Sequence, residues 1–499
     1  MAPTKLLDLH NKILEAAKDF GYREGKNALL RDCIIDKKTK SVRTVTEEDA
    51  NFWFGFVRED QPSNGAYDGL SFVIFPEEKG KHCLVSIGIG SSSLGKDGDL
   101  AQNPGFRRSF MRLIKKGNSD AKFFFKLRFD DMETSTPGLQ EEFYPTDATK
   151  KNQYENVIKN TSTKYNADSS KEAPGLLPAA FIVDYTTEDG WDLILSWLAQ
   201  YARWRCWDKF GTGSDMPGNA KKINEAISKC RVSLDCPTPD KIYKILKDKK
   251  YVVLQGAPGC GKTWSANEVA SHFSEVVFIQ FHAETAYSDF VYGIRPVLDG
   301  TTLAYKGEKG VLLKAIDKAK NSKGKVLLII DEINRANLAN VLGPVFYLFE
   351  PNTKRNHKLH LGTEWEDQQE KPIELDKLPE NLYVLATMNT ADKSLAVVDF
   401  ALRRRFAWVT LYPHKLDIDN FDTELFEKVD ELFSRYATDE ELNLQPGQSY
   451  FMDTNKRRAN IKFGLMPLMK EYFAEGFLLS AKEEFAQLFT SETGTYMYK

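Results

Sequence analysis

Residues 251–263, YVVLQGAPGCGKT, constrain the fold of this chain more than any other stretch. An apolar run ends at a glycine-rich loop, and the loop closes on Lys262 and Thr263 where a helical pattern begins. Glycines let successive backbone N–H groups approach a polyphosphate, the lysine supplies a positive charge, and the threonine offers Mg²⁺ a hydroxyl. The spacing GxxxxGK[ST] therefore predicts a nucleotide site. The residues expected to bind the nucleotide are Gly256, Ala257, Pro258, Gly259, Cys260, Gly261, Lys262 and Thr263.

Length, charge and cysteine usage narrow the class of protein. A chain of 499 residues is long for one core, so we expect two or three domains. The net charge of −3 excludes a globally basic protein, and any contact with nucleic acid must come from a local patch. The 6 cysteines form no CxxC pair and fit a reducing cytosol. No apolar run approaches the roughly 20 residues that a bilayer requires, so we predict a cytoplasmic, non-membrane protein.

Residues 1–207 are predicted to form an α+β domain in which helices and strands do not alternate strictly. Apolar residues at helical spacing predict helices, and short apolar or alternating runs predict strands. Polar residues 131–176 are expected to form loops. The predicted helices cover residues 4–20, 105–116 and 191–204, and the predicted strands cover 51–57, 70–75, 82–90, 121–129 and 177–183.

Residues 208–235 are predicted to be a linker, because 208–220 are rich in Gly, Pro and Asp. A second domain is expected to begin at residue 236. From there strands and helices alternate, which is typical of a parallel sheet with crossover helices. The predicted strands of this sheet cover residues 251–255, 276–281, 325–331, 381–389 and 407–412.

Polar residues follow the apolar runs of this second domain. A carboxylate at the strand end Asp331–Glu332 can hold Mg²⁺ through water, and a second can orient an attacking water. Asn389 ends another strand, where it can contact a γ-phosphate. The arginines of ALRRRF, residues 401–406, can neutralise charge on a phosphoryl group in a neighbouring subunit. Taken singly, these residues also fit a solvated strand end, a turn and a basic helix end.

The order of these segments resembles the AAA+ motor of the McrB family, the GTP-hydrolysing subunits of modification-dependent restriction systems. The resemblance implies an α/β AAA+ core, a P-loop NTPase with a five-stranded parallel sheet, over residues 236–412, and a C-terminal helical lid over 413–499. It also implies a hexameric ring. The matching segments are LQGAPGCGKT, QFHAETAYSDFVYGIRP, IIDEINRANLANVLG, MNTADKSLAVVDFALRRRF and, in the lid, GQSYF.

The resemblance assigns roles to individual residues. Asp331 and Glu332 would be the Walker B pair, with Thr263 and Asp331 at the Mg²⁺. Asn334 and Asn389 would act near the γ-phosphate, and Arg404 and Arg405 would be arginine fingers acting on a neighbouring subunit. The chain departs from the family in carrying Lys393, Ala257 and Cys260 where relatives often have Arg, Pro and Val. None of these changes removes a group that hydrolysis needs.

The residues do not identify the base of the nucleotide. Asn389–Asp392 imitates the NKxD guanine motif, but a residue at that strand end faces the phosphates. The family resemblance implies GTP, whereas generic AAA+ chemistry would use ATP.

An Asp-Gly turn within residues 297–307 predicts a hairpin. It resembles the hairpin that lines the pore of the ring in this branch of AAA+ proteins. The alternative is an ordinary surface hairpin.

The first domain resembles, more loosely, the N-terminal DNA-binding domain of some McrB proteins, which flips a modified cytosine into a pocket. Such a pocket needs aromatic walls and a basic rim. Trp53 and Phe54 cannot both face one side of a strand, so at least one is expected in the core. The basic residues also fit a solvated face. The candidates are Trp53, Phe54 and Tyr67 for the walls, and Arg107, Arg108, Arg112, Lys122, Lys126 and Arg128 for the rim.

No convincing PD…ExK nuclease pattern is present, so cutting would require a separate, McrC-like subunit. One hypothesis is therefore a nucleotide-hydrolysing motor and DNA-recognition subunit of a restriction complex. The alternative is an ATP-driven remodeller of the MoxR kind, whose N-terminal domain binds a protein or ligand. The MNTADKS and RRRF segments favour the first hypothesis.

Overall fold

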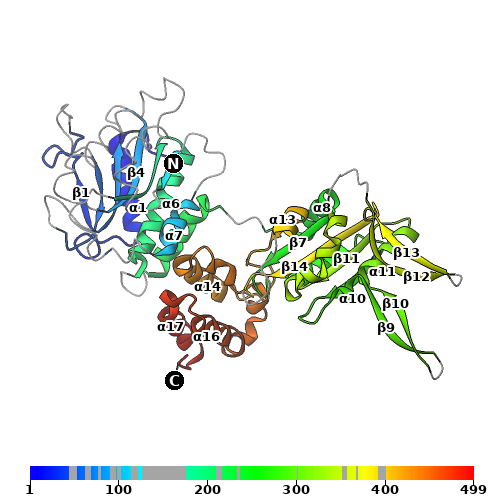
Figure 1. Cartoon of the computed structure of the whole chain (residues 1–499). Helices are drawn as coiled ribbons and strands as arrows, with labels where there is room; N and C mark the ends of the chain where they lie inside the picture. Colours follow the sequence, from blue (N-terminus) through cyan, green and yellow to red (C-terminus); the bar gives the residue numbers. More distant parts are fainter. Residues whose placement is uncertain are drawn as a thin grey trace, which may run out of the picture. The chain divides into compact units, whose positions relative to one another are not determined.

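The structure is a computed structural model, and the chain divides near residue 233 into two compact units, which are described separately (Figure 1). The residues described are 1–43, 53–61, 69–76, 80–89, 97, 103–113, 122–125, 176–209, 216–232, 236–299, 302–350, 357–366, 369–391 and 400–498.

The first unit contains a 6-stranded antiparallel sheet of strand order β1-β2-β3-β4-β6-β5. Apolar residues alternate in β3, so that Leu70, Phe72 and Ile74 join one core while Ser71 and Val73 face the other side. The strands are β1 (Leu29–Asp32), β2 (Phe54–Val57), β3 (Leu70–Pro76), β4 (His82–Ile89), β5 (Lys122–Phe125) and β6 (Leu176–Asp184).

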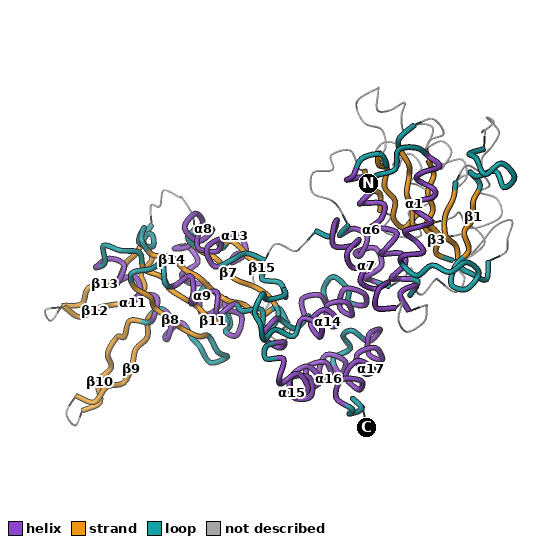
Figure 2. Tube along the Cα trace, turned by 180° about the vertical axis from the view of Figure 1, so that it is seen from behind, coloured by secondary structure: helices purple, strands orange, loops and turns teal. Residues whose placement is uncertain are grey.

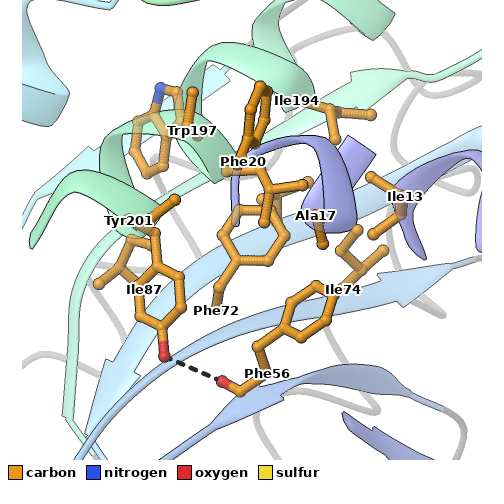
Figure 3. Close-up of a cluster of buried hydrophobic side chains, with 14 of the residues drawn as sticks. Ile13, Ala17, Phe20, Phe56, Phe72, Ile74, Ile87, Ile194, Trp197 and Tyr201 are labelled. Atoms are coloured by element: carbon orange, nitrogen blue, oxygen red, sulfur yellow. Dashed lines mark hydrogen bonds between the residues drawn. The ribbon is translucent and has the colours of Figure 1, made fainter. Parts of the chain in front are cut away.

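Helices cover one face of this sheet and share its core. Tyr201 shows how the two layers are joined: its side chain is buried, and its hydroxyl shares one proton between the backbone oxygens of Phe56 and Leu70, at 3.2 and 3.1 Å. Figure 3 shows the bond to Phe56. The helices of this unit are α1 (Leu6–Asp19), α3 (Pro104–Met111), α6 (Glu188–Trp204), the 3-10 turn η3 (Trp207–Lys209) and α7 (Met216–Cys230).

The linker predicted over residues 208–235 is wrong for most of its length. Residues 216–230 form α7, and its apolar stripe of Ile223, Ala226, Ile227 and Cys230 packs into the core of the first unit. Those spacings of three and four residues place all four side chains on one helix face. The Gly, Pro and Asp residues before the stripe led to the wrong prediction.

The predicted helix over 105–116 ends earlier, at Met111, and residues 126–175 lie outside the described part of the chain.

The second unit is built on the predicted 5-stranded parallel sheet, of order β15-β7-β14-β11-β8. This confirms the α/β core. The runs of Val, Leu and Ile in the inner strands are buried on both faces, as parallel strands between helices require. The strands are β7 (Tyr251–Gly256), β8 (Glu275–Gln280), β11 (Val326–Asp331), β14 (Leu382–Asn389) and β15 (Ala407–Thr410).

Two hydrophobic cores lie on opposite faces of this sheet, one under α8 and α9 and the other under α11 (Figure 2). The longer helices are α8 (Pro239–Lys249), α9 (Lys262–Ala270) and α11 (Val311–Asn321). The short elements are α10 (Tyr287–Phe290), η4 (Ile333–Arg335), α12 (Leu338–Val341), η5 (Gly343–Phe349) and α13 (Phe400–Arg405).

Two hairpins project from this unit (Figure 1). The predicted hairpin is confirmed as β9 (Tyr292–Asp299) with β10 (Thr302–Lys309). The second hairpin, β12 (Leu359–Glu366) with β13 (Gln369–Leu375), was not predicted. The hydroxyl of Tyr292 joins them by donating to the backbone oxygen of Thr363 at 2.7 Å.

Helices and 3-10 turns follow the sheet, over the range predicted for the lid, and all but residues 434–436 of them belong to the second unit. Arg457 ties several of them together through ion pairs with Asp422, Glu424 and Glu492. The elements are α14 (Thr423–Tyr436), η6 (Glu441–Leu444), η7 (Gln448–Phe451), η8 (Thr454–Lys456), α15 (Arg457–Asn460), the π turn η9 (Ile461–Leu465), α16 (Met466–Ala474), η10 (Leu479–Ala481) and α17 (Lys482–Thr493). Among the described residues, no helix has the length and apolar character needed to cross a membrane.

Candidate nucleotide-binding site

The strand register brings the predicted site residues to one edge of the parallel sheet. Asn389 pairs with Gly256 across β14 and β7, and Asp331 is the last residue of β11, the other neighbour of β14. Because the carboxyl ends of parallel strands meet at the same edge, the phosphate loop, the two carboxylates and Asn389 lie together. Ligands of open α/β sheets bind at this edge.

The phosphate loop has the backbone that its sequence predicts. Gly259 and Gly261 have φ values of 79° and 78°, in the left-handed region that favours glycine. The helix α9 begins directly at Lys262, so its unpaired N–H groups and its positive dipole end face the loop. The loop therefore has the backbone conformation that its glycines predict, with the start of a helix directly after it.

Lys262 is buried and directed into the loop. Its ammonium group donates to the backbone oxygens of Gly256 and Ala257, each at 2.9 Å. Burial lowers the pKa of Lys262, and the negative charges of Glu332 and Asp331 oppose this shift. Phosphate oxygens would stabilise this buried cation better than the neutral carbonyls do, so the lysine fits a nucleotide.

Cys260 is an unreactive part of the same loop. Burial raises the pKa of its thiol to about 12, so the group remains a neutral thiol at physiological pH. A thiol in that state is neither a nucleophile nor a metal ligand.

The residues expected to hold Mg²⁺ are in contact. Thr263 is exposed at the start of α9, and its hydroxyl donates to Asp331 Oδ1 at 3.2 Å. A hydroxyl beside a carboxylate is an all-oxygen set of the kind that Mg²⁺ prefers, with further positions left for water and phosphate. The two residues thus fit the metal that the phosphate loop implies.

Glu332 follows Asp331 in a left-handed conformation, with φ 52° and ψ 48°. Its Oε2 lies 3.5 Å from Arg335 Nε and accepts no hydrogen bond from the described residues. A carboxylate oxygen with unused capacity at this position can accept a hydrogen bond from a water, which is the action of a group that orients the nucleophile.

Asn334 and Asn389 form a linked pair. The amide nitrogen of Asn334 donates to the backbone oxygen of Asn389 at 3.1 Å, and the Asn389 side-chain oxygen accepts from Ala391 N at 3.2 Å. Asn334 is buried, and its Oδ1 has no partner among the described residues. A buried amide oxygen without a partner is costly unless a ligand or water completes it.

The lid segment GQSYF, which carried no assigned role in the sequence, packs directly on the phosphate loop. Gly447 N donates to Pro258 O at 2.8 Å, and Ser449 N donates to Gly259 O at 3.1 Å. Between them, the Gln448 amide donates to Cys260 O at 3.0 Å, and its buried Oε1 has no partner in the described part of the chain. Only the family resemblance pointed to this segment, because the lid has no hydrophobic pattern that would place it here.

Thr387 is a second residue that sequence reasoning missed. It lies on β14, buried between the two carboxylate residues, and hydrogen-bonds both. A threonine within an apolar strand is common, so the sequence alone offered no signal for it.

The structure distinguishes the two predicted finger arginines. Both end α13 and both pair with Glu350, but the side chain of Arg404 is 67% exposed whereas that of Arg405 is 9% exposed. Arg405 also lies over the ring of Phe346, 5.4 Å from its centroid. Only Arg404 can leave its partner and reach outward without breaking packing.

The proposed DNA residues of the first unit are less completely described. Trp53 lies half-buried beside Phe75, with ring centroids 6.5 Å apart, whereas Phe54 is buried in the core. The prediction that at least one of these two rings is core is confirmed. Arg108 lies on α3. Tyr67, Lys126, Arg128 and the side chain of Arg107 lie outside the described residues.

Comparison with known proteins identifies the kind of domain that the second unit contains. Residues 251–406 match the family of the AAA domain (dynein-related subfamily). Together with the parallel sheet and the phosphate loop, this match defines the second unit as an AAA-type nucleoside-triphosphatase domain.

Two curated proteins are similar in sequence to parts of this chain. The chain is 34% identical over 267 residues to the Type IV methyl-directed restriction enzyme EcoKMcrB subunit of Escherichia coli K12, which covers 47% of this chain and 56% of that protein. It is 27% identical over 208 residues to the Type II restriction enzyme BsuMI component YdiS of Bacillus subtilis 168, over 35% of this chain and 61% of that protein. The chain is thus similar in part to these two restriction-enzyme subunits, and it spans less than two thirds of the length of either relative.

Proposed function

We propose that this chain is the GTP-preferring AAA+ motor and DNA-recognition subunit of a modification-dependent restriction complex. The observation that carries the proposal is the identity to EcoKMcrB, together with the meeting of the proposed Mg²⁺-binding and γ-phosphate-binding side chains at one sheet edge. In this proposal the chain acts in the cytoplasm against foreign DNA, and a separate McrC-like subunit cuts the DNA.

Each residue of the site has a part in phosphoryl transfer. Lys262 and the backbone N–H groups of the loop hold the β- and γ-phosphates, and Thr263 with Asp331 holds Mg²⁺. The metal ion neutralises charge on the phosphate oxygens. Glu332 orients the attacking water through Oε2, which accepts no hydrogen bond from the described residues, and Asn334 with Asn389 binds beside the γ-phosphate.

A ring of subunits completes the site. Arg404 is the finger, because its exposed side chain can reach the γ-phosphate held by a neighbouring copy. Arg405 fixes the end of α13 through Glu350 and Phe346, so that the finger projects from a rigid base. We propose a hexamer, with the β9–β10 hairpins lining its pore.

The choice of GTP over ATP rests on the McrB likeness alone. The described side chains at the sheet edge face the phosphates, which both nucleotides share. The DNA-recognition role rests on the N-terminal resemblance, with Trp53 as the described wall residue and a modified base as its ligand.

Hydrolysis of GTP and ATP, measured side by side on the full chain, tests the proposal. We expect turnover of GTP that exceeds turnover of ATP at equal concentration, and stimulation by DNA that carries modified cytosine. Addition of an McrC-like nuclease should produce cleavage of modified DNA and none of unmodified DNA. ATP turnover that ignores DNA of every modification would favour the remodelling ATPase instead.

A further inference from the structure

Thr387 connects the two acidic residues of the site through one hydroxyl group. Its Oγ1 donates to Asp331 Oδ1 at 2.6 Å and accepts from Glu332 N at 3.0 Å. The residue is 1% exposed, so water cannot replace either bond. A hydroxyl has a single proton, and donating it to the carboxylate leaves its lone pairs to receive the N–H. Both bonds therefore form at once with one orientation of the hydroxyl.

The bond to Glu332 acts at a backbone position that needs support. Glu332 has a φ of 52°, a left-handed conformation that residues other than glycine adopt only where their surroundings hold them. Its N–H is the group that Thr387 fixes. The hydroxyl thus holds the peptide between Asp331 and Glu332, and that peptide sets where both carboxylates point.

The bond to Asp331 is shorter than the one that Thr263 makes to the same oxygen, at 2.6 Å against 3.2 Å. Short O–H···O⁻ bonds are charge-assisted and stronger than neutral ones. Thr263 is exposed on the phosphate loop, where its hydroxyl is needed for the metal ion, whereas Thr387 is buried on a strand. Thr387 can therefore hold the carboxylate in every state of the site.

We propose that Thr387 is a positioning residue that sets the Mg²⁺-binding and water-orienting carboxylates relative to one another. The proposal rests on the proposed hydrolysis and deepens it. The described hydrogen bonds of the threonine hydroxyl are to Asp331 and Glu332, and it acts through these two residues.

Thr387→Val tests this inference, because valine keeps the shape of threonine and removes the hydroxyl. The variant leaves Asp331 Oδ1 and Glu332 N without their buried partner, so kcat should fall by about 10- to 100-fold. Thr387→Ser restores a hydroxyl and should recover activity to within about 3-fold of wild type. Thr410→Val is the matched control, since Thr410 lies on β15 of the same sheet and bonds only Gln255 at 2.9 Å among the contacts described.

A binding measurement provides a readout that does not depend on turnover. The affinity of a non-hydrolysable fluorescent guanine or adenine nucleotide is measured in EDTA and across a Mg²⁺ titration. Wild type and Thr410→Val should gain affinity with Mg²⁺. Thr387→Val should bind as they do in EDTA but need at least about 3-fold more Mg²⁺ for half of the gain, because Asp331 is no longer held.

Two results would overturn the inference: a Thr387→Val protein with wild-type kcat and Mg²⁺ dependence, or equal losses in Thr387→Ser and Thr387→Val. If the valine variant does not fold, as judged by circular dichroism, Thr387→Ala replaces it with the same expectations. If wild type hydrolyses no nucleotide, the proposed function fails, and the Mg²⁺ titration still decides the role of Thr387.

Discussion

Replacement of Gly447 by any other residue is predicted to destabilise the second unit, because Gly447 packs against the backbone of the phosphate loop. Its φ of −73° is open to any residue, so the constraint is one of space. A Cβ at this position would lie 2.1 Å from Gly259 C and 2.2 Å from Cys260 N, both backbone atoms of the loop. To restore ordinary contacts of about 3.5 Å, the lid segment must withdraw by roughly 1 Å or more.

That withdrawal determines how much stability the substitution costs. It stretches the bonds from Gly447 N to Pro258 O and from Ser449 N to Gly259 O, which measure 2.8 and 3.1 Å. Lost hydrogen bonds and overpacking together should lower the free energy of unfolding of the second unit by about 2–4 kcal/mol in Gly447→Ala. For a domain of this size, the Tm should fall by at least about 4 °C.

Thermal unfolding of the full chain, followed by calorimetry, measures the effect, and added nucleotide identifies the transition of the second unit. Gly464→Ala is the control, because a Cβ there meets only the Tyr450 ring, at 3.6 and 4.0 Å. The control should melt within about 2 °C of wild type. If Gly447→Ala melts together with the control, the lid does not rest on the loop as described.

Four further predictions concern function. Lys262→Ala should weaken nucleotide binding by at least about 10-fold in an equilibrium titration, because the phosphates lose the loop's cation; unchanged affinity would remove the site assignment. Glu332→Gln should bind nucleotide normally yet hydrolyse it at least about 100-fold more slowly, and a wild-type rate would show that it does not orient the water. Arg404→Ala should abolish hydrolysis and spare Tm, whereas Arg405→Ala should lower Tm as well, and mixing Arg404→Ala with Lys262→Ala protein should restore some activity if the finger acts between subunits. Trp53→Ala, checked for folding by circular dichroism, should erase the preference for modified over plain DNA in a binding assay while salt-dependent, non-specific binding remains.

The sequence predicted the second unit well because its signals were local. Long apolar runs predicted the five strands, and the polar residues directly after them, Asp331 and Asn389, came to lie at one edge because parallel strands align their ends. The glycines of the phosphate loop predicted its backbone conformation, because they adopt the positive φ values that it requires.

What the sequence did not predict depended on contacts between distant residues. Thr387 acts through Asp331 and Glu332, 56 and 55 positions away, and nothing in its own neighbourhood marks it. Gln448 meets Cys260 across 188 positions. Composition misled at α7, where turn-forming residues precede a helix whose apolar stripe is set by the core it joins.

Lys262 has oxygen partners within its own loop, since its ammonium group donates to the backbone oxygens of Gly256 and Ala257. A phosphate group entering the loop therefore exchanges one set of acceptors for another, and no lysine has to be drawn out of water. The consequence is that this buried cation need not be left without oxygen partners while phosphates replace the carbonyls.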